Sequence, residues 1–224
     1  MAIKPYTAVG LIPTVRGIRK REDIMVNIEH LSHLVKAASW LSSLSLPVRL
    51  IAYPEGALQG FNDEVLDADH AEFANTCCID VPGPETDELG KIARQYDSYI
   101  MAQAKARHPD WKDRYFNVGI ILDPQGEVIL VHYKVSPLFP VEHSVCPHDV
   151  YDWWVEKYGN TLDAFWPVVD TDIGRLGIMM ANEGSYPENA RALALNGAEV
   201  VYRASYPHPA TGNEIFEIQS RARA

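Results

Sequence analysis

The stretch Gly177-Ile-Met-Met-Ala181-Asn-Glu-Gly-Ser-Tyr-Pro187-Glu188 carries the strongest structural signal in this sequence. Its first half is an apolar run typical of a buried strand, and its second half predicts a sharp turn into a helix. A strand, an elbow and a helix in this order lift a nucleophile out of a sheet and place it beside the positive end of a helix. The residue at that point is Ala181, which has neither a thiol nor a hydroxyl. The pattern predicts a hydrolase scaffold without its attacking atom, although Ala181 taken alone also fits a small core residue.

The helix after the elbow has a predicted start. Ser185 fits the N-cap, Pro187 the first turn and Glu188 the acidic partner of a capping box. A helix that begins there directs the positive end of its dipole toward position 181. Such a setting lowers the pKa of a thiol, and a nearby carboxylate completes its activation.

The rest of the chain alternates strand and helix patterns. Residues 23–44 repeat apolar side chains at the spacing of one helix face, and residues 117–122 and 128–133 flank a proline–glycine turn typical of a hairpin. We expect strands at 8–13, 48–53, 98–104, 117–122, 128–133, 168–169, 176–180 and 199–203, and helices at 23–44, 86–96, 185–195 and from 213 onward. This alternation predicts an α/β layered fold with helices on at least one sheet face.

Composition narrows the functional classes. The 224 residues suffice for one large domain, and 20 basic against 30 acidic residues give a net charge of −10, which opposes binding to nucleic acid. No apolar run reaches the ~20 residues of a membrane span, so we expect no membrane partner. The sequence begins without a signal peptide, so we expect a cytoplasmic location. Three cysteines fit a reducing compartment, and Cys146 near His143 and His148 lacks the spacing of a zinc site, so no metal is expected.

Two further residues with catalytic chemistry follow predicted strands. Glu55, in Tyr53-Pro-Glu55-Gly56, can act as a general base if it faces a cleft, although it also fits a solvated loop. Lys134 ends the hairpin strand and can stabilise an oxyanion, or it is an ordinary strand-end lysine. Glu142 lies eight residues later on a proline-rich loop of the kind that lines sites.

Taken in order, three motifs resemble the nitrilase (carbon–nitrogen hydrolase) superfamily, and within it the aliphatic amidases and formamidases. The motifs are Pro54-Glu55, Tyr133-Lys134 and the elbow Tyr186-Pro187-Glu188…Arg191…Gly197-Ala198-Glu199. The hairpin around Asp123-Pro-Gln-Gly126 and the later Arg203 and Tyr206-Pro207 are also similar. The resemblance runs from about residue 8 to the end.

The resemblance implies a four-layer αββα sandwich, a single domain over residues 1–224, and pairing into homodimers or higher homo-oligomers. It implies hydrolysis of small linear amides through a thioester, without a metal or organic cofactor. Catalytic roles would fall to Glu55, to Lys134 and to position 181. Contacts with the substrate would come from the residues Glu142, Asn182, Glu183, Tyr186 and Arg203.

The sequence departs from the family pattern at three points. Ala181 occupies the nucleophile position, Gly56-Ala57 replaces an aromatic residue near the first glutamate, and the chain stops inside a predicted helix, as if its C-terminal part were missing. We expect either an amidase scaffold that is inactive or crippled, or a non-catalytic relative that binds a small ligand or a protein partner. Direct attack by water with Glu55 as base is a third, weaker route. The substrate, and whether the alanine is natural, stay open.

Overall fold

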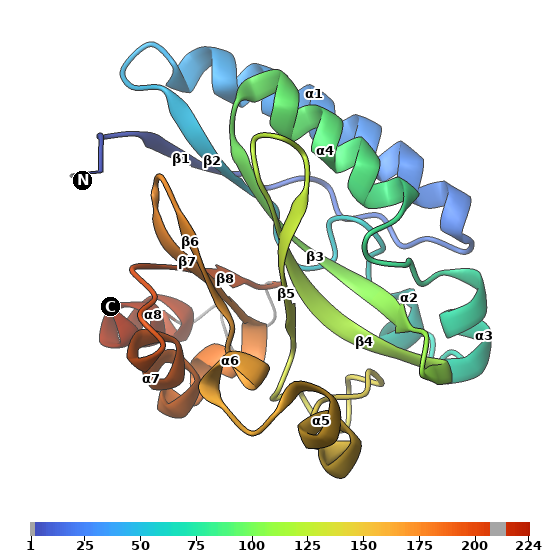
Figure 1. Ribbon diagram of the computed structural model, residues 1–224. Helices are drawn as coiled ribbons and strands as arrows, with labels where there is room; N and C mark the ends of the chain where they lie inside the picture. The colour runs from blue at the N-terminus through green and yellow to red at the C-terminus, as the bar shows by residue number, and fades with distance from the viewer. Residues whose placement is uncertain (1–2, 207–213) are drawn as a thin grey trace.

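Two β-sheets lie face to face between layers of helices in the computed structural model, which describes residues 3–206 and 214–224 (Figure 1). The larger sheet has the strand order β1-β2-β3-β4-β5, and the smaller one has the order β6-β7-β8. The strands are β1 (Thr7–Gly10), β2 (Val48–Ala52), β3 (Tyr99–His108), β4 (Trp111–Leu122), β5 (Val128–Tyr133), β6 (Val168–Thr171), β7 (Gly174–Met180) and β8 (Val200–Ala204).

Whether two neighbouring strands are parallel or antiparallel depends on the segment that connects them. Strands β1, β2 and β3 are parallel and are joined through helices, whereas β3, β4 and β5 form an antiparallel meander. In the smaller sheet β6 and β7 form a hairpin, and β8 lies parallel to β7 after a helical crossover. Parallel neighbours need a long crossover, which explains the alternation read from the sequence.

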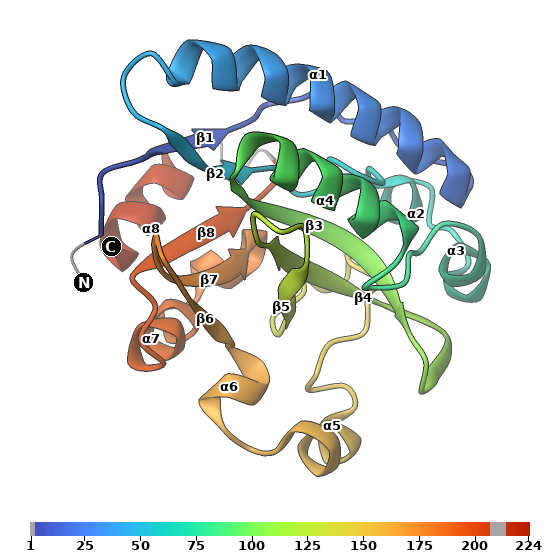
Figure 2. The same ribbon diagram turned by 45° about the horizontal axis from the view of Figure 1, so that its top comes forward.

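Helices cover the outer faces of both sheets (Figure 2). The long helices α1 and α4 lie over the larger sheet, and α7 and α8 lie on the side of the smaller sheet. The helices are α1 (Ile24–Ser42), α2 (Asn62–Val65), α3 (His70–Thr76), α4 (Pro84–Tyr96), α5 (Tyr151–Tyr158), α6 (Leu162–Phe165), α7 (Pro187–Leu195) and α8 (Ile215–Arg223), with 3₁₀ turns η1 (Arg21–Asp23) and η2 (Ala181–Ser185). The order helix, sheet, sheet, helix confirms the predicted αββα sandwich.

The core between the sheets is apolar and positions β7. Leu176, Ile178 and Met180 of β7 are fully buried against Met101 and Ile121 of the larger sheet. A strand buried on both faces reads as a continuous hydrophobic run, which is the pattern seen before the elbow. Because the apolar run holds β7 between the two sheets, it also positions the last residues of β7 at the edge of the sandwich.

Most predicted elements are present with shifted ends. The first predicted helix is α1, the proline–glycine hairpin joins β4 and β5, and β3 extends four residues beyond its predicted end to His108. Helices α2, α3, α5 and α6 were not expected, because each is too short to show a hydrophobic period. None of the helices in residues 3–206 and 214–224 is long and apolar enough to cross a membrane. That residues 1–224 form a single domain stays a prediction.

The two sheets approach closely at Gly119, and this contact yields a stability prediction. A Cβ at Gly119 would lie 2.6 Å from Cγ2 of Ile178, so Gly119→Ala overpacks the core between the sheets. We expect the free energy of unfolding to fall by about 1–3 kcal/mol in urea titrations. Gly10→Ala is the control, since no atom lies within 4 Å of its added Cβ. Equal stability of the two variants would contradict this packing.

Candidate active site

Three strand ends surround one cavity of about 240 Å³. Glu55 follows β2 and Lys134 follows β5 in the larger sheet, whereas Ala181 follows β7 in the smaller sheet. Parallel strands bring their carboxyl ends to one edge, and β5 ends in the same region. The lining residues are Glu55, Phe61, Glu64, Val65, Lys134, Leu138, Val141, Glu142, Ala181, Asn182 and Tyr206.

Lys134 is a buried ammonium held by two carboxylates. Its Nζ lies 2.7 Å from both oxygens of Glu142 and 3.2 Å from Oε1 of Glu55. Burial alone would lower the pKa of Lys134, but the charges of Glu55 and Glu142 outweigh burial and raise it above its usual value. Lys134 therefore stays positively charged at neutral pH.

A chain of amides fixes the two carboxylates. Nδ2 of Asn117 donates to Oε1 of Glu55 at 3.1 Å and to Oε1 of Glu142 at 3.0 Å. Nε2 of Gln103 donates to Oδ1 of Asn117 at 2.7 Å, and the Gly56 N–H donates to Oε1 of Gln103 at 2.8 Å. Glu55, Gln103 and Asn117 are buried and the Glu142 side chain is only 7% exposed, so the network defines one geometry for the two carboxylates. The role of Gln103 was not predictable from sequence, because the partner of a polar residue inside a strand is set by the strand register.

The elbow has an unusual backbone at Ala181. Its φ of +37° lies in the left-handed region that costs energy for a residue with a side chain. Nε and Nη2 of Arg203 donate to the carbonyl oxygen of Ala181 at 3.1 and 2.9 Å, and the Arg203 guanidinium lies 4.2 Å from the centre of the Phe216 ring. Arg203 thus stabilises the strained backbone at Ala181 through its hydrogen bonds to the carbonyl oxygen.

Glu183 ties the elbow to the end of β5. Its buried carboxylate accepts hydrogen bonds from the N–H groups of Met180 and Val135, both at 2.7 Å, and lies 3.0 Å from Nε2 of His132. Burial favours the neutral acid, but His132 and the two N–H groups prevail and lower the pKa of Glu183. The charge on Glu183 therefore stabilises the position of Ala181 relative to Lys134.

The predicted capping box is wrong. The N-cap of α7 is Tyr186 and carries no side-chain cap, Pro187 is the first helical residue, and Glu188 is exposed. Ser185 ends the 3₁₀ turn η2 instead, because the Glu183 carboxylate binds Met180 N–H and tightens the chain directly after the strand.

The residues expected to form the site separate into two groups. Glu55, Lys134, Glu142, Ala181 and Asn182 line the cavity. Glu183, Tyr186 and Arg203 do not: the first is buried behind the elbow, the second is exposed, and the third binds the backbone of Ala181. Glu183 and Arg203 therefore contact the elbow and Tyr186 faces solvent, and none of the three lines the cavity.

An aromatic pair compensates for the absent aromatic after Glu55. A Cβ at Gly56 would lie 2.2 Å from Cε2 of Phe61, so the ring of Phe61 fills the space beside Gly56. The rings of Phe61 and Tyr206 lie 4.5 Å apart, and the Tyr206 N–H donates to Oε2 of Glu55 at 3.3 Å. An aromatic wall is therefore present, but it comes from other elements.

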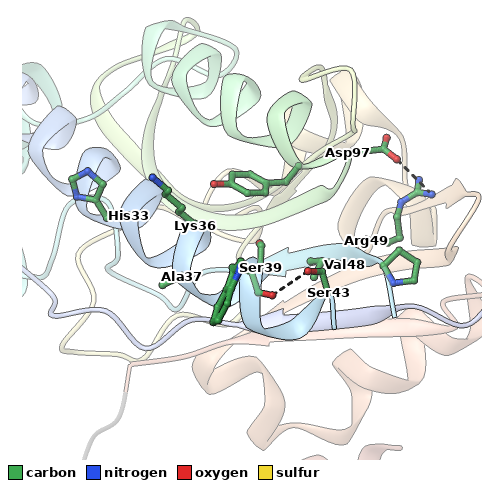
Figure 3. Close-up of a pocket in the computed structure, with 11 residues that line it drawn as sticks. His33, Lys36, Ala37, Ser39, Ser43, Val48, Arg49 and Asp97 are labelled. Atoms are coloured by element: carbon green, nitrogen blue, oxygen red, sulfur yellow. Dashed lines mark hydrogen bonds and ion pairs between the residues drawn. The ribbon is translucent and has the colours of Figure 1, made fainter. Parts of the chain in front are cut away.

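A larger surface hollow of about 780 Å³ lies at the other end of β2, beside the C-terminal turns of α1 and α4 (Figure 3). Its charged groups do not converge. His33 and Lys36 lie along α1 at one end, and Arg49 lies at the other, 4.0 Å from Asp97. We assign no chemistry to this hollow.

Among the residues that the structure describes, no three His, Cys, Asp or Glu side chains are placed to hold a metal ion. Cys77, Cys78 and Cys146 are free and buried, and Nδ1 of His148 lies 3.2 Å from the carbonyl oxygen of Val135. The absence of a cofactor from the reaction stays a prediction.

The comparison with known proteins agrees with this geometry. The family model described as carbon-nitrogen hydrolase matches residues 8–224, which is almost the whole chain. This chain belongs to the carbon–nitrogen hydrolase family. The nitrilase resemblance of the Glu55, Lys134 and elbow motifs is thereby confirmed.

The chain is similar to named members of this family. A formamidase from Bacillus thuringiensis is 36% identical over 159 residues, which is 70% of this chain and 41% of the formamidase. The chain thus matches less than half of that relative's length. Nit3 of Saccharomyces cerevisiae, from branch 10 of the nitrilase superfamily, aligns with a TM-score of 0.70 at 19% identity, over 96% of this chain and 70% of Nit3. A cysteine-to-alanine mutant of the Nesterenkonia AN1 amidase aligns with a TM-score of 0.65 at 19% identity, over 93% and 69%.

The Glu183 contacts predict a large stability effect of a substitution at this position. Glu183→Ala leaves two buried N–H groups unpaired and should lower the free energy of unfolding by about 3–5 kcal/mol in urea titrations. Glu188→Ala is the control, because Glu188 is exposed on the same segment. Since the folded-state pKa of Glu183 is lowered, the difference should persist above pH ~4.5 and shrink as the pH falls through the folded-state pKa. Equal costs for the two variants would remove Glu183 as the anchor of the elbow.

Proposed function

We propose that this chain binds a short linear amide in the 240 Å³ cavity and hydrolyses it at a negligible rate. The observation that carries the proposal is the position of Ala181. It stands at a strained elbow, in one cavity with a buried lysine and two carboxylates, and its side chain is a methyl group that forms no bond to a carbonyl carbon.

The retained groups account for binding. The Lys134 ammonium is a buried, charged donor, which can stabilise negative charge that develops on a carbonyl oxygen. Glu55 and Glu142 present acceptor oxygens to the N–H groups of an amide, and Asn117 holds both oxygens in place. Recognition of an amide therefore does not depend on the nucleophile.

A thiol at position 181 would complete a known type of chemistry. Thiolate attack forms a thioester and releases ammonia, with Glu55 as the base that takes and returns the proton and Lys134 as the oxyanion donor. Glu183 and Arg203 fix the backbone of the elbow independently of the side chain at 181. The scaffold is therefore proposed to accept a cysteine without rearrangement.

The formamidase relative supports the choice of a short amide. The volume of the cavity agrees with it, since a water molecule takes about 30 Å³ and the cavity has room for about eight groups of that size. A second candidate function is a non-catalytic binding protein, and the exposed Phe139 and Leu66 near the cavity favour a protein partner in that case.

Oligomerisation is a separate part of the proposal. Helices α7 and α8 expose Leu195 and Ile218, which lie on the outer helical layer and suit pairing of two copies. Sedimentation equilibrium should show a dimer, and Ile218→Glu should shift it toward the monomer. A monomer at micromolar concentration would contradict this part of the proposal.

The catalytic proposal is tested by ammonia release from formamide and short aliphatic amides. The chain as it stands should be slower than its Ala181→Cys variant by a factor on the order of 10⁴–10⁶, because the variant gains a thiolate beside Glu55. Glu55→Gln in the Ala181→Cys background is the control and should remove the gain.

Two outcomes contradict the proposal. Rapid turnover by the alanine form shows that the site works without a nucleophile at 181. A folded Ala181→Cys variant that binds amides but stays inert favours the binding-protein function instead.

A further inference from the structure

A third carboxylate faces the cavity and is used by no step above. Glu64 of α2 lines the cavity together with Glu55 and Glu142. Its Oε1 lies 2.9 Å from Nζ of Lys105, a lysine of β3 that is fully buried. Only 12% of the Glu64 side chain is exposed.

Lys105 already has a partner that satisfies its charge. It forms a buried ion pair with Asp63, whose second oxygen accepts a hydrogen bond from the Tyr115 hydroxyl at 2.8 Å. Lys105 also lies over the rings of Phe61 and Phe73 rather than in the cavity wall. Glu64 is therefore the surplus carboxylate of this group.

The same imbalance holds at the other side of the cavity, where Glu55 and Glu142 share Lys134. Three carboxylates, Glu55, Glu64 and Glu142, therefore line the cavity with one ammonium group, Lys134, while the Asp63–Lys105 pair lies behind the wall, so the whole group has an excess of two negative charges. Buried carboxylates that share a single counter-ion are only partly compensated for their lost hydration, so the cavity favours a ligand that brings positive charge.

We propose that the ligand of this site is a short amide that also carries a protonated amine, with the ammonium group at Glu64 and the amide carbonyl at Lys134. This rests on the proposed function, because it assigns the ligand of the same cavity. The cavity also has an apolar lining, which suits a methylene spacer and comes from Phe61, Val65, Leu138, Val141 and Tyr206.

The ionisation of Glu64 fits this role. Burial raises its pKa to about 7, Lys105 opposes that rise, and the nearby charges of Asp63 and Glu142 add to it. A cation at Glu64 offsets this destabilisation of the carboxylate. The ionised Glu64 carboxylate is thus destabilised when no ligand is bound and stabilised when it pairs with a cation.

A matched pair of amides tests the proposal. 4-Aminobutanamide and pentanamide have equal length, and at pH 8.5 the first is a cation because an alkyl ammonium group has a pKa near 10. Isothermal titration calorimetry should give a dissociation constant at least about tenfold lower for the cation, the effect expected of a charged hydrogen bond in a buried site.

Substitutions at Glu64 assign the preference. Glu64→Gln should reduce the ratio of the two dissociation constants to near one, whereas Glu64→Asp, which keeps the charge, should retain part of it. Glu29→Gln, at an exposed position of α1, is the control for a change in net charge and should keep the full ratio. Circular dichroism melts establish that each variant is folded.

A pH series adds a readout that a structural role of Glu64 would not produce. The ratio should fall toward one below about pH 7 as Glu64 takes up a proton. Glu55, Glu142 and Asp63 also face this region, and Glu64→Gln separates their titration from that of Glu64.

The outcomes are distinct. Equal binding of both amides, or tighter binding of the anionic amide succinamic acid, overturns the cationic ligand and leaves the proposed function in place. Failure of both 4-aminobutanamide and pentanamide to bind overturns this inference and the proposed function together. A preference that persists in Glu64→Gln overturns the role of Glu64.

Discussion

The ion pairs of Lys134 are the constraint on which the rest of the site depends. An ammonium group removed from water loses several kcal/mol of hydration, and it stays charged only if carboxylates replace the water. Glu55 and Glu142 provide this replacement from two different segments, one after β2 and one in the loop beyond β5. Whatever moves either segment leaves a buried charge without a partner. The free-energy cost of separating these buried charges therefore keeps the two segments together.

A second set of contacts acts on the smaller sheet and does not involve the side chain at position 181. Glu183 binds the N–H groups on both sides of the gap between β7 and the end of β5, and Arg203 binds the carbonyl oxygen of Ala181. These contacts keep the left-handed backbone of Ala181, although alanine gains nothing from it by itself. The backbone at position 181 is thus held in place without any contribution from the side chain there. The same separation allows binding and catalysis to be tested independently.

The parts of this structure that were predictable from sequence are those that depend on local sequence patterns. The apolar run of β7 and Pro187 indicate the strand and the elbow, and the strand-end positions of Glu55 and Lys134 point to one edge of the sandwich. Their convergence follows from parallel strands, whose carboxyl ends meet. The motif order led to the correct family because it reflects this shared edge.

The parts that were missed depend on contacts between distant segments. Gln103 and Asn117 become neighbours only through the register of β3 with β4, which no local pattern encodes. Glu64 lies on a single-turn helix without hydrophobic periodicity, so nothing in its surroundings indicated a cavity. Ser185 matched a capping box, but the hydrogen bond from Met180 N–H to Glu183 set a different start for the helix. In each case a tertiary contact outweighed the local preference.

The most direct test of the account is a crystal structure of this protein soaked with propionamide. We expect the carbonyl oxygen at about 3 Å from Nζ of Lys134, with the amide N–H groups toward Glu55 and Glu142 and the carbonyl carbon facing the Ala181 methyl group. An amide that lies elsewhere, or an empty cavity at saturating ligand with Lys134 still paired as described, would contradict the central claim that Lys134 and its two carboxylates form an amide-binding site.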